Sequence, residues 1–296
     1  TNQSFDLSDI KLLHVGIDTL KPLYECLIKE EVIEEIQAIY ESGFHSIITT
    51  DQIDWKISKS SSKSGYQWIL KNLDIGYTVL LKSFYAEAGI RASHLKLEIS
   101  PHAIIGKTLK QVSDKALSIA KLFTYQIAEK SVAVHIAVDV KGVELPQDFE
   151  YSLVTKSKRV MKFNGISDCD MKLAEVAAIY GRNETYTFGN ASSLQFSTYD
   201  KINESIKGDK IGFWEEQWKK GPSTDDFMTP EYQPGDNVRR FEFRFHHSVI
   251  QEFCYGTQDS QGNHIQINNI EQLEPHLTAL WRYALNNFRY QASDRY

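Results

Sequence analysis

Hydrophobic and polar residues alternate along several stretches of the chain, a pattern typical of β-strands with one buried and one polar face. Two pairs of these strands are separated by short loops, one of them containing Gly189-Asn190, and each pair predicts a hairpin. We expect strands at residues 15–20, 77–85, 94–100, 132–140, 184–188, 193–202 and 238–246.

Other stretches repeat their hydrophobic residues with the period of a helix. Residues 30–42 begin with acidic residues and are followed by Gly43, which predicts a helix that ends at that glycine. We expect further helices at residues 108–129, 171–180 and 270–290.

Together these elements predict an α+β fold with a central, mainly antiparallel sheet and helices packed on its apolar face. The segments HVGID, YTVLLKSFYAE and HLKLEIS in the first half are echoed by HIAVD, SLQFSTYDKINE and RRFEFRF in the second half. This echo favours two fused ferredoxin-like units, an N-terminal unit at 1–130 and a C-terminal unit at 131–296. Any α+β chain can give such echoes, and the two parts can also form a single catalytic domain.

Composition places the chain among soluble globular proteins. Its 296 residues are 42% hydrophobic and 24% charged, enough for one large domain or two smaller ones. The start of the sequence resembles no secretory signal and lacks a Met, which indicates a trimmed chain. No apolar run is long enough for a membrane helix, so we expect no membrane association.

Cysteine content and net charge narrow the function classes. The chain has 3 cysteines, far apart and without CxxC spacing, which argues against disulfides or a cysteine zinc site and favours a reducing cytoplasm. Lys and Arg number 33 against 39 acids, for a net charge of −6. This balance argues against a protein that holds nucleic acid by bulk positive charge, and it leaves a local basic surface open.

Four predicted strands carry charged or polar residues on one face and hydrophobic residues on the other. A solvated outer face of an antiparallel sheet gives the same pattern. The residues on these polar faces are His135 and Asp139; Arg240, Glu242, Arg244 and His246; His94, Lys96 and Glu98; and Ser197, Tyr199, Lys201 and Asn203.

These residue types favour metal-assisted phosphoryl transfer to a tyrosine. Carboxylates and imidazoles can hold a hard cation, a lysine can hold a phosphate, and a phenol can act as nucleophile. Tyr199 is central because Lys201 is expected on the same side of its strand, where the ammonium can lower the pKa of the phenol. A cross-strand Tyr/Lys pair without chemistry fits the same spacing.

The run ETYTFGNASSLQFSTYDKINES at 184–205, followed by VRRFEFRF at 238–245, resembles the core of rolling-circle replication initiators. These include plasmid initiators of the replication-initiation-factor type and the nicking-closing initiators of filamentous phages. HLKLEISPHAIIG at 94–106 and HIAVDV at 135–140 resemble two upstream strands of that family, in the family's order. The fold implied is that of HUH-nuclease-like ferredoxin units.

The resemblance implies that the chain is a DNA strand-nicking endonuclease and transesterase. Tyr199 would attack a phosphodiester and form a 5′-phosphotyrosine, with Lys201 at the scissile phosphate or the tyrosine oxygen. Tyr186 is a second candidate nucleophile. The implied cofactor is Mg²⁺ or Mn²⁺, held by Asp139 and Glu242 with Glu98 or His135 as further ligands. His246 is expected near this site, and His247 is expected to be structural.

The resemblance also implies partners. They are origin DNA, supercoiled or single-stranded, and a host helicase and polymerase in the bacterial cytoplasm; a homodimer is left open. Trp214, Trp218 and Tyr232 are candidates for stacking on unpaired bases, and aromatic residues of this kind are more often part of the core. A conjugative relaxase with the same chemistry and a non-catalytic DNA- or RNA-binding module are the alternatives. Candidate DNA-binding residues are Lys156, Lys158, Arg159, Lys162, Arg240 and Arg244.

Overall fold

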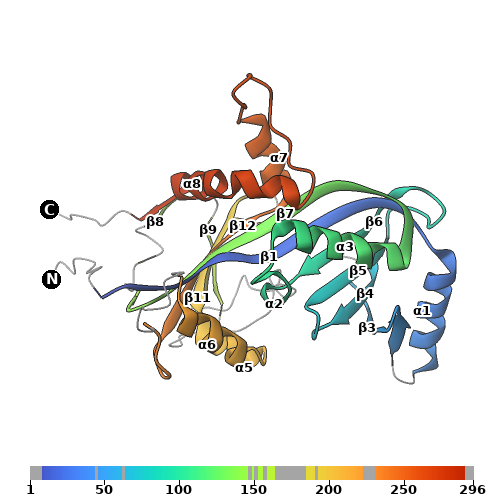
Figure 1. Cartoon of the computed structure of the whole chain (residues 1–296), viewed down its shortest axis with the longest axis horizontal. Coiled ribbons are helices and arrows are strands. Elements are labelled where there is room, and N and C mark those ends of the chain that lie inside the picture. The colour runs from blue at the N-terminus through green and yellow to red at the C-terminus, as the bar shows by residue number, and fades with distance from the viewer. Residues whose placement is uncertain are drawn as a thin grey trace. The chain divides into compact units, whose positions relative to one another are not determined.

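The structure, a computed structural model, describes residues 9–43, 46–61, 64–145, 149, 153–155, 159–163, 185–190, 193–222 and 231–290. The helix expected at 171–180 lies outside the described residues. The strands (Figure 1) are β1 (Lys11–Ile28), β2 (Ile47–Thr50), β3 (Ile53–Lys59), β4 (Tyr66–Asn72), β5 (Tyr77–Ser83), β6 (Ala92–Ile99), β7 (Thr124–Lys141), β8 (Leu153–Thr155), β9 (Arg159–Phe163), β10 (Thr185–Phe188), β11 (Gln195–Asp200), β12 (Val238–Phe245) and β13 (Phe288–Tyr290). The helices are α1 (Glu30–Ser42), α2 (Pro101–Ile104), α3 (Leu109–Phe123), α5 (Lys201–Lys207), α6 (Ile211–Lys220), α7 (His247–Tyr255), the 3₁₀ helix η3 (Glu271–His276) and α8 (Leu277–Asn287).

The fold is α+β and built on antiparallel sheet, as the sequence predicts. The chain divides into two compact units, each assembled from separate stretches. Unit 1 comprises Thr1–Gly16, His135–Val249 and Thr278–Tyr296, and unit 2 comprises Ile17–Val134 and Ile250–Leu277. The division falls within β1 and β7, so each of these strands contributes one part to each unit.

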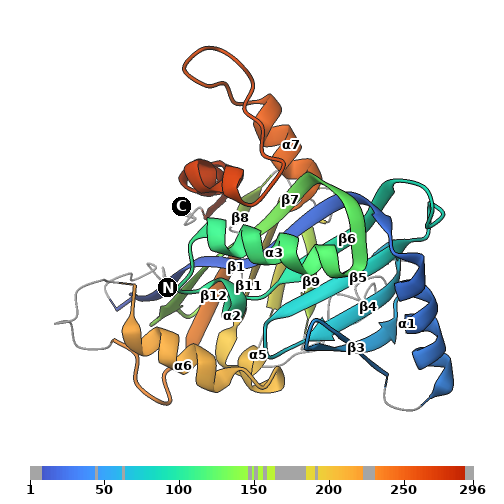
Figure 2. The same ribbon diagram turned by 45° about the vertical axis from the view of Figure 1, so that its right-hand side comes forward.

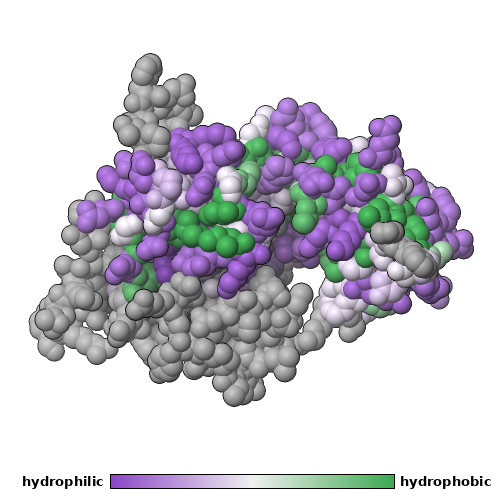
Figure 3. All heavy atoms as spheres, turned by 90° about the horizontal axis from the view of Figure 1, so that it is seen from below, coloured by the Kyte–Doolittle hydropathy of each residue, from purple (hydrophilic) through white to green (hydrophobic). Residues whose placement is uncertain are grey.

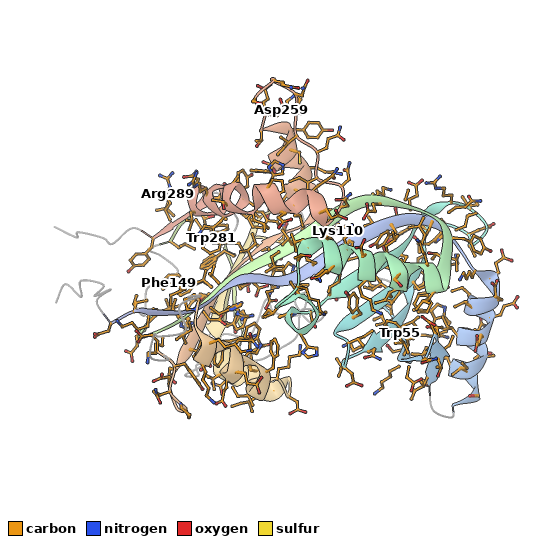
Figure 4. All side chains as sticks on the ribbon, in the orientation of Figure 1. Trp55, Lys110, Phe149, Asp259, Trp281 and Arg289 are labelled. Carbon is orange, nitrogen blue, oxygen red and sulfur yellow. The ribbon has the colours of Figure 1, made fainter. Side chains whose placement is uncertain are left out.

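Unit 2 contains the strand order β2-β3-β4-β5-β6-β1-β7. Helix α1 packs on β2 and β3, and α3 packs on β6. The core between helices and sheet is aromatic: the Trp55 ring lies 5.6 Å from Phe123 at the end of α3, and Trp68 lies 5.5 Å from Tyr40 of α1. Figure 2 shows α1 and α3 beside these strands, and Figure 4 labels Trp55.

Two predictions for unit 2 helices have different outcomes. Helix α1 has the predicted bounds, and Gly43 adopts the left-handed conformation expected of a helix stop, with φ of 69°. The predicted end of the second helix at residue 129 is wrong. Thr124 ends α3 in an extended conformation, with its hydroxyl donating to the carbonyl of Ala120, and begins β7. Pairing of β7 with β1 outweighs the local helical pattern here.

Unit 1 contains the strand order β1-β7-β12-β11-β10-β9, and β8 pairs with β13 in a separate two-stranded sheet. Phe243 of β12 contacts Phe196 of β11 and Trp281 of α8, with ring centroids 5.1 and 5.0 Å apart. Helix α8 therefore covers the aromatic face of these strands, and α5 packs against β11 and β12 as well as against α6. Figure 1 shows α8 and the α5–α6 pair on opposite sides of β11 and β12.

The two predicted hairpins are confirmed: β5 pairs with β6 and β10 pairs with β11, both antiparallel. Gly189 turns the second hairpin with φ of 87°, and a Cβ there would lie 2.4 Å from the carbonyl oxygen of Leu194. A side chain at this position would therefore strain the turn that leads into β11.

Two chain segments end differently from the prediction. Strand β11 ends at Asp200, whose carboxylate accepts a hydrogen bond from the backbone of Asn203 and caps α5, so Lys201 is helical rather than part of the strand. The helix expected at 270–290 is divided into η3, which contains Pro275, then α8 and then β13.

Two of the three echoed segment pairs occupy equivalent positions in the two units, whereas HVGID is divided between the units at Gly16. In unit 2 the HLKLEI strand β6 lies between β5 and β1, and in unit 1 the RRFEFRF strand β12 lies between β11 and β7. Unit 2 thus places the β5–β6 hairpin beside β1, and unit 1 places the antiparallel pair β11–β12, whose strands are joined through α5 and α6, beside β7.

No helix among the described residues is long and apolar enough to span a membrane. On the face seen in Figure 3, hydrophobic residues form separate patches among hydrophilic ones.

Candidate active site

The site is assembled on three strands of unit 1. In the register of β11 and β12, Tyr199 lies opposite Arg240 and Ser197 lies opposite Glu242. Tyr199 and Glu242 are therefore diagonal neighbours on one face, within reach of long side chains. His135 comes from the part of β7 that belongs to unit 1.

Glu242 is the centre of a hydrogen-bonded cluster. Its Oε2 accepts a hydrogen bond from the hydroxyl of Tyr199 over 3.0 Å. Its Oε1 accepts from Nε of Arg244 over 2.8 Å and contacts Nδ1 of His135 at 3.0 Å. The sequence predicts each of these residues as a site residue, and the structure brings all of them onto one carboxylate. We call Tyr199, His135, Arg244 and Glu242 the Glu242 cluster.

The Glu242 carboxylate is buried, with 2% of the residue exposed. Burial by itself raises the pKa of such a group, but the Arg244 guanidinium and His135 outweigh burial and hold the pKa of Glu242 well below its usual range. Glu242 is therefore ionised at neutral pH and accepts hydrogen bonds from its neighbours.

Asp139 and Arg240 form a second buried pair, and both are 0% exposed. Arg240 donates to both carboxylate oxygens over 2.6 and 2.7 Å, and the indole of Trp218 donates to one of them over 2.8 Å. The Arg240 guanidinium overcomes the opposing effect of burial and lowers the pKa of Asp139. Asp139 and Arg240 bind each other in the interior. The prediction of Asp139 as a metal ligand is therefore not supported, and neither is the prediction of Arg240 as a DNA contact.

Lys201, the first residue of α5, reaches the site from the end of β11. Its ammonium is paired with Glu204 and lies 4.7 Å from the ring centroid of Trp214 and 5.8 Å from that of Tyr199. Only 3% of Lys201 is exposed. The predicted proximity of Lys201 to Tyr199 therefore arises from the strand-to-helix turn, and not from a shared strand face.

The sequence offers Trp214 of α6 for base stacking and not as a contact of Lys201 and Arg240. The Arg240 guanidinium lies 4.1 Å from its ring centroid, so the same indole contacts both Arg240 and Lys201. Trp214, Trp218 and Tyr232 are all buried, and the expectation that they stack on unpaired bases is not supported. The contacts of Trp214 with Lys201 and Arg240 join residues far apart in the sequence, so the sequence pattern does not indicate them.

His246 lies beside the Glu242 cluster. Its ring is 6.2 Å from that of His135, and its Nε2 is 2.6 Å from the side-chain oxygen of Gln195. His247 begins α7 instead of continuing β12. Gln195 is a second site residue that sequence reasoning missed, since a buried glutamine carries no distinctive pattern.

The remaining predicted residues lie elsewhere. Tyr186 is 4% exposed, and its ring packs 5.6 Å from that of Phe149. Glu98 belongs to unit 2, where its carboxylate pairs with Lys21 over 3.1 Å. Arg159 and Lys162 lie in β9, whereas Lys156 and Lys158 lie outside the described residues.

The geometry is suited to a hard divalent cation at His135 and Glu242, whose ligand atoms are close enough to share one ion. Mg²⁺ is commonly held by one or two carboxylates together with water and substrate phosphate oxygens. His135 and Glu242 are of the ligand types that fit a metal, although Glu242 also pairs with Arg244. Asp139 pairs with Arg240 and Glu98 pairs with Lys21.

Comparison with known proteins adds one relative. No protein-family model matches the sequence. The chain is 34% identical over 289 residues to a protein named uncharacterized protein ORF430 of Pseudomonas phage Pf1. The similarity covers 97% of the chain, which spans 65% of the length of that relative. The name of the relative states no activity, so the functional argument rests on the geometry of the site.

Proposed function

We propose that the chain is a sequence-specific, divalent-metal-dependent DNA nicking-closing enzyme that initiates rolling-circle replication. The observation that carries the proposal is the hydrogen bond from the Tyr199 hydroxyl to the ionised, buried carboxylate of Glu242. A half-buried phenol that donates to a carboxylate is oriented for nucleophilic attack, and the acceptor can take its proton.

In the proposed reaction, the Tyr199 oxygen attacks the phosphorus of a DNA phosphodiester as its proton passes to Glu242. The bond from phosphorus to the 3′ oxygen breaks, that oxygen takes a proton from a water molecule, and the proton on Glu242 neutralises the hydroxide that is left. The products are a free 3′-hydroxyl and a 5′-phosphotyrosine. Because the ester bond is kept, the 3′-hydroxyl can attack the phosphotyrosine and close the strand.

Cations surround the reacting groups. Arg244 and His135 keep Glu242 ionised and fixed, and Lys201 is held near the Tyr199 ring by Trp214 and Glu204. When bound at His135 and Glu242, Mg²⁺ or Mn²⁺ would neutralise charge that develops on the phosphate oxygens. Exchange of the Lys201–Glu204 pair for a Lys201–phosphate contact would place the ammonium on the substrate.

The proposed biological setting is supported by the chemistry and by the phage origin of the relative. A free 3′-hydroxyl is the primer that a polymerase needs, so host polymerase and helicase are the proposed partners in a bacterial cytoplasm. Similarity to a phage protein supports replication of a phage over plasmid replication or conjugative transfer.

The test uses single-stranded oligonucleotides that cover the noncoding DNA of the element encoding the chain. They are labelled at the 3′ end, because the proposed adduct retains the fragment 3′ to the nick. Incubation with MgCl₂ or MnCl₂ should give a labelled protein band on a denaturing gel. Tyr199→Phe should abolish this band, and Tyr186→Phe, which alters a core tyrosine, should retain it.

A labelled band from Tyr199→Phe at the wild-type level refutes the assignment. Loss of the band only in Tyr186→Phe would move the nucleophile to that residue. A wild-type protein that binds these oligonucleotides yet forms no adduct with either metal would be a non-catalytic binding module.

A further inference from the structure

One face of the unit 2 sheet carries lysines in directly opposed positions. Lys56 of β3 lies opposite Lys71 of β4 in the strand register, and both residues are exposed. Neither lysine forms a salt bridge with any residue that the structure describes. Like charges at opposed positions on neighbouring strands destabilise a sheet, so this pair costs stability.

The same face continues across the next strands. Lys71 lies opposite Thr78 of β5, and Thr78 lies opposite Glu98 of β6. Lys96 is two residues before Glu98 and therefore points to the same face. Lys21 of β1 reaches this face as well, because its ammonium lies 3.1 Å from the Glu98 carboxylate. We call Lys21, Lys56, Lys71 and Lys96 the lysine face.

Positive charge exceeds negative charge on this face. Glu98 and Asp54 are the acids among these four lysines, and Asp54 accepts a hydrogen bond from the hydroxyl of Thr49. Burial lowers the pKa of Lys96, and the neighbouring Lys21 lowers it further. Glu25, farther along β1, is matched by its own two cations, Arg91 and Lys130.

The opposite face of these strands is the core face. Trp55, Leu70, Val79 and Leu97 are buried there, and α1 and α3 pack over it. The lysine face therefore contributes no hydrophobic core beneath these helices. Strands in a sheet lie about 4.8 Å apart, so a row from β3 to β1 extends over about 19 Å.

We propose that the lysine face binds the sugar–phosphate backbone of the substrate DNA. This inference rests on the proposed function, since it assumes that DNA is the substrate. The lysines hold the strand through charge and do not read its bases, because a lysine ammonium on a phosphate oxygen carries no sequence information. Lys56 and Lys71 repel each other in the free protein, and a phosphate bound between them would replace this repulsion with attraction.

The test measures binding of a fluorescent single-stranded oligonucleotide by anisotropy at several salt concentrations, with Tyr199→Phe as background to prevent covalent reaction. Lys56→Gln/Lys71→Gln should weaken binding by about 10- to 30-fold at 0.1 M salt and lower the salt slope by about 1.4, for two lost phosphate contacts. The same double variant should melt at the wild-type temperature or above it, because the repulsion between the lysines is removed.

The matched control is Lys110→Gln/Lys115→Gln, which removes two exposed lysines from α3, the helix on the core side of the sheet. Figure 4 labels Lys110 on this helix. The control carries the same change in net charge and should retain wild-type affinity and salt slope.

Unchanged affinity and salt slope in Lys56→Gln/Lys71→Gln would overturn the inference and leave an acidic protein as the partner to seek. Equal weakening by the α3 control would also overturn it, since the loss would then reflect net charge alone. DNA binding through this face without any adduct from wild-type protein would refute the proposed function and retain this inference. If Lys56→Gln/Lys71→Gln with Tyr199 intact forms the adduct at the same DNA concentrations as wild-type protein, this inference is refuted and the proposed function is retained.

Discussion

Arg240 binds Asp139 through both carboxylate oxygens, in a pair that is excluded from solvent on every side. The sequence suggests separate roles for these residues, one toward a metal and one toward DNA. In the structure they neutralise each other, and Trp218 supplies a further hydrogen bond. The pair connects β12 to β7 within unit 1 and so holds the strand that carries Glu242.

Because this pair is buried, the loss of one partner should leave an uncompensated charge. We expect Arg240→Met to lower the free energy of unfolding by about 3–5 kcal/mol, measured by urea denaturation. The double variant Asp139→Leu/Arg240→Met should be more stable than Arg240→Met, since no lone charge is left. A double variant that loses the sum of both single losses would contradict the pairing.

The effect of Mn²⁺ on the melting temperature should show that Glu242, and not Asp139, is a metal ligand. Wild-type protein should gain thermal stability when MnCl₂ is added, because an ion that binds only the folded chain stabilises it. Glu242→Gln and His135→Gln should lose this gain, whereas Asp139→Asn should melt lower but keep it. A Mn²⁺ response that disappears only in Asp139→Asn would identify Asp139 as the ligand instead.

Trp214 should act as a positioning residue for Lys201. Trp214→Leu removes a ring that contacts two buried cations, and we expect a loss of about 2 kcal/mol or more in stability. The rate of adduct formation at saturating DNA should also fall, and Trp214→Phe should restore part of it. Trp281→Phe, which alters an indole on α8 against Phe243, is the matched control (Figure 4). Trp281→Phe should lower stability without lowering the rate of adduct formation. If this control lowers the rate as much as Trp214→Leu does, the role of Trp214 is structural only.

Stability should decrease in acid because of the two buried carboxylates. The folded-state pKa values of Glu242 and Asp139 lie below their ordinary values of 4.5 and 3.8, so the unfolded chain binds more protons in this range. Their contribution is present above these ordinary values and is lost as pH falls through the lower folded values. Urea denaturation at a series of pH values should show this decrease, and Asp139→Asn/Glu242→Gln should flatten it. An unchanged slope in the double variant would assign the acid sensitivity to other groups.

Local patterns predict much of the fold because they record local preferences. Helix α1 begins with acids and ends at a glycine that can adopt a positive φ, and both hairpins follow from alternation and turn residues. Where the local pattern fails, a distant partner or a cap decides the structure. Residues 124–129 join β7 because β1 pairs with it, and Asp200 ends β11 because its carboxylate caps α5.

The sequence by itself placed Tyr199, His135, Glu242 and Arg244 on the polar faces of their strands and so made them candidates, but it wrongly extended the strand of Tyr199 to Lys201. Strand periodicity is a property of the backbone and needs no knowledge of neighbours. Only the tertiary structure decided which charges pair, because a salt bridge depends on residues far apart in the chain. It assigned Asp139 to Arg240, Glu98 to Lys21 and Lys201 to the Trp214 ring. The tertiary structure also showed that Trp214, Trp218 and Tyr232 are buried, because helix packing and not composition sets their exposure.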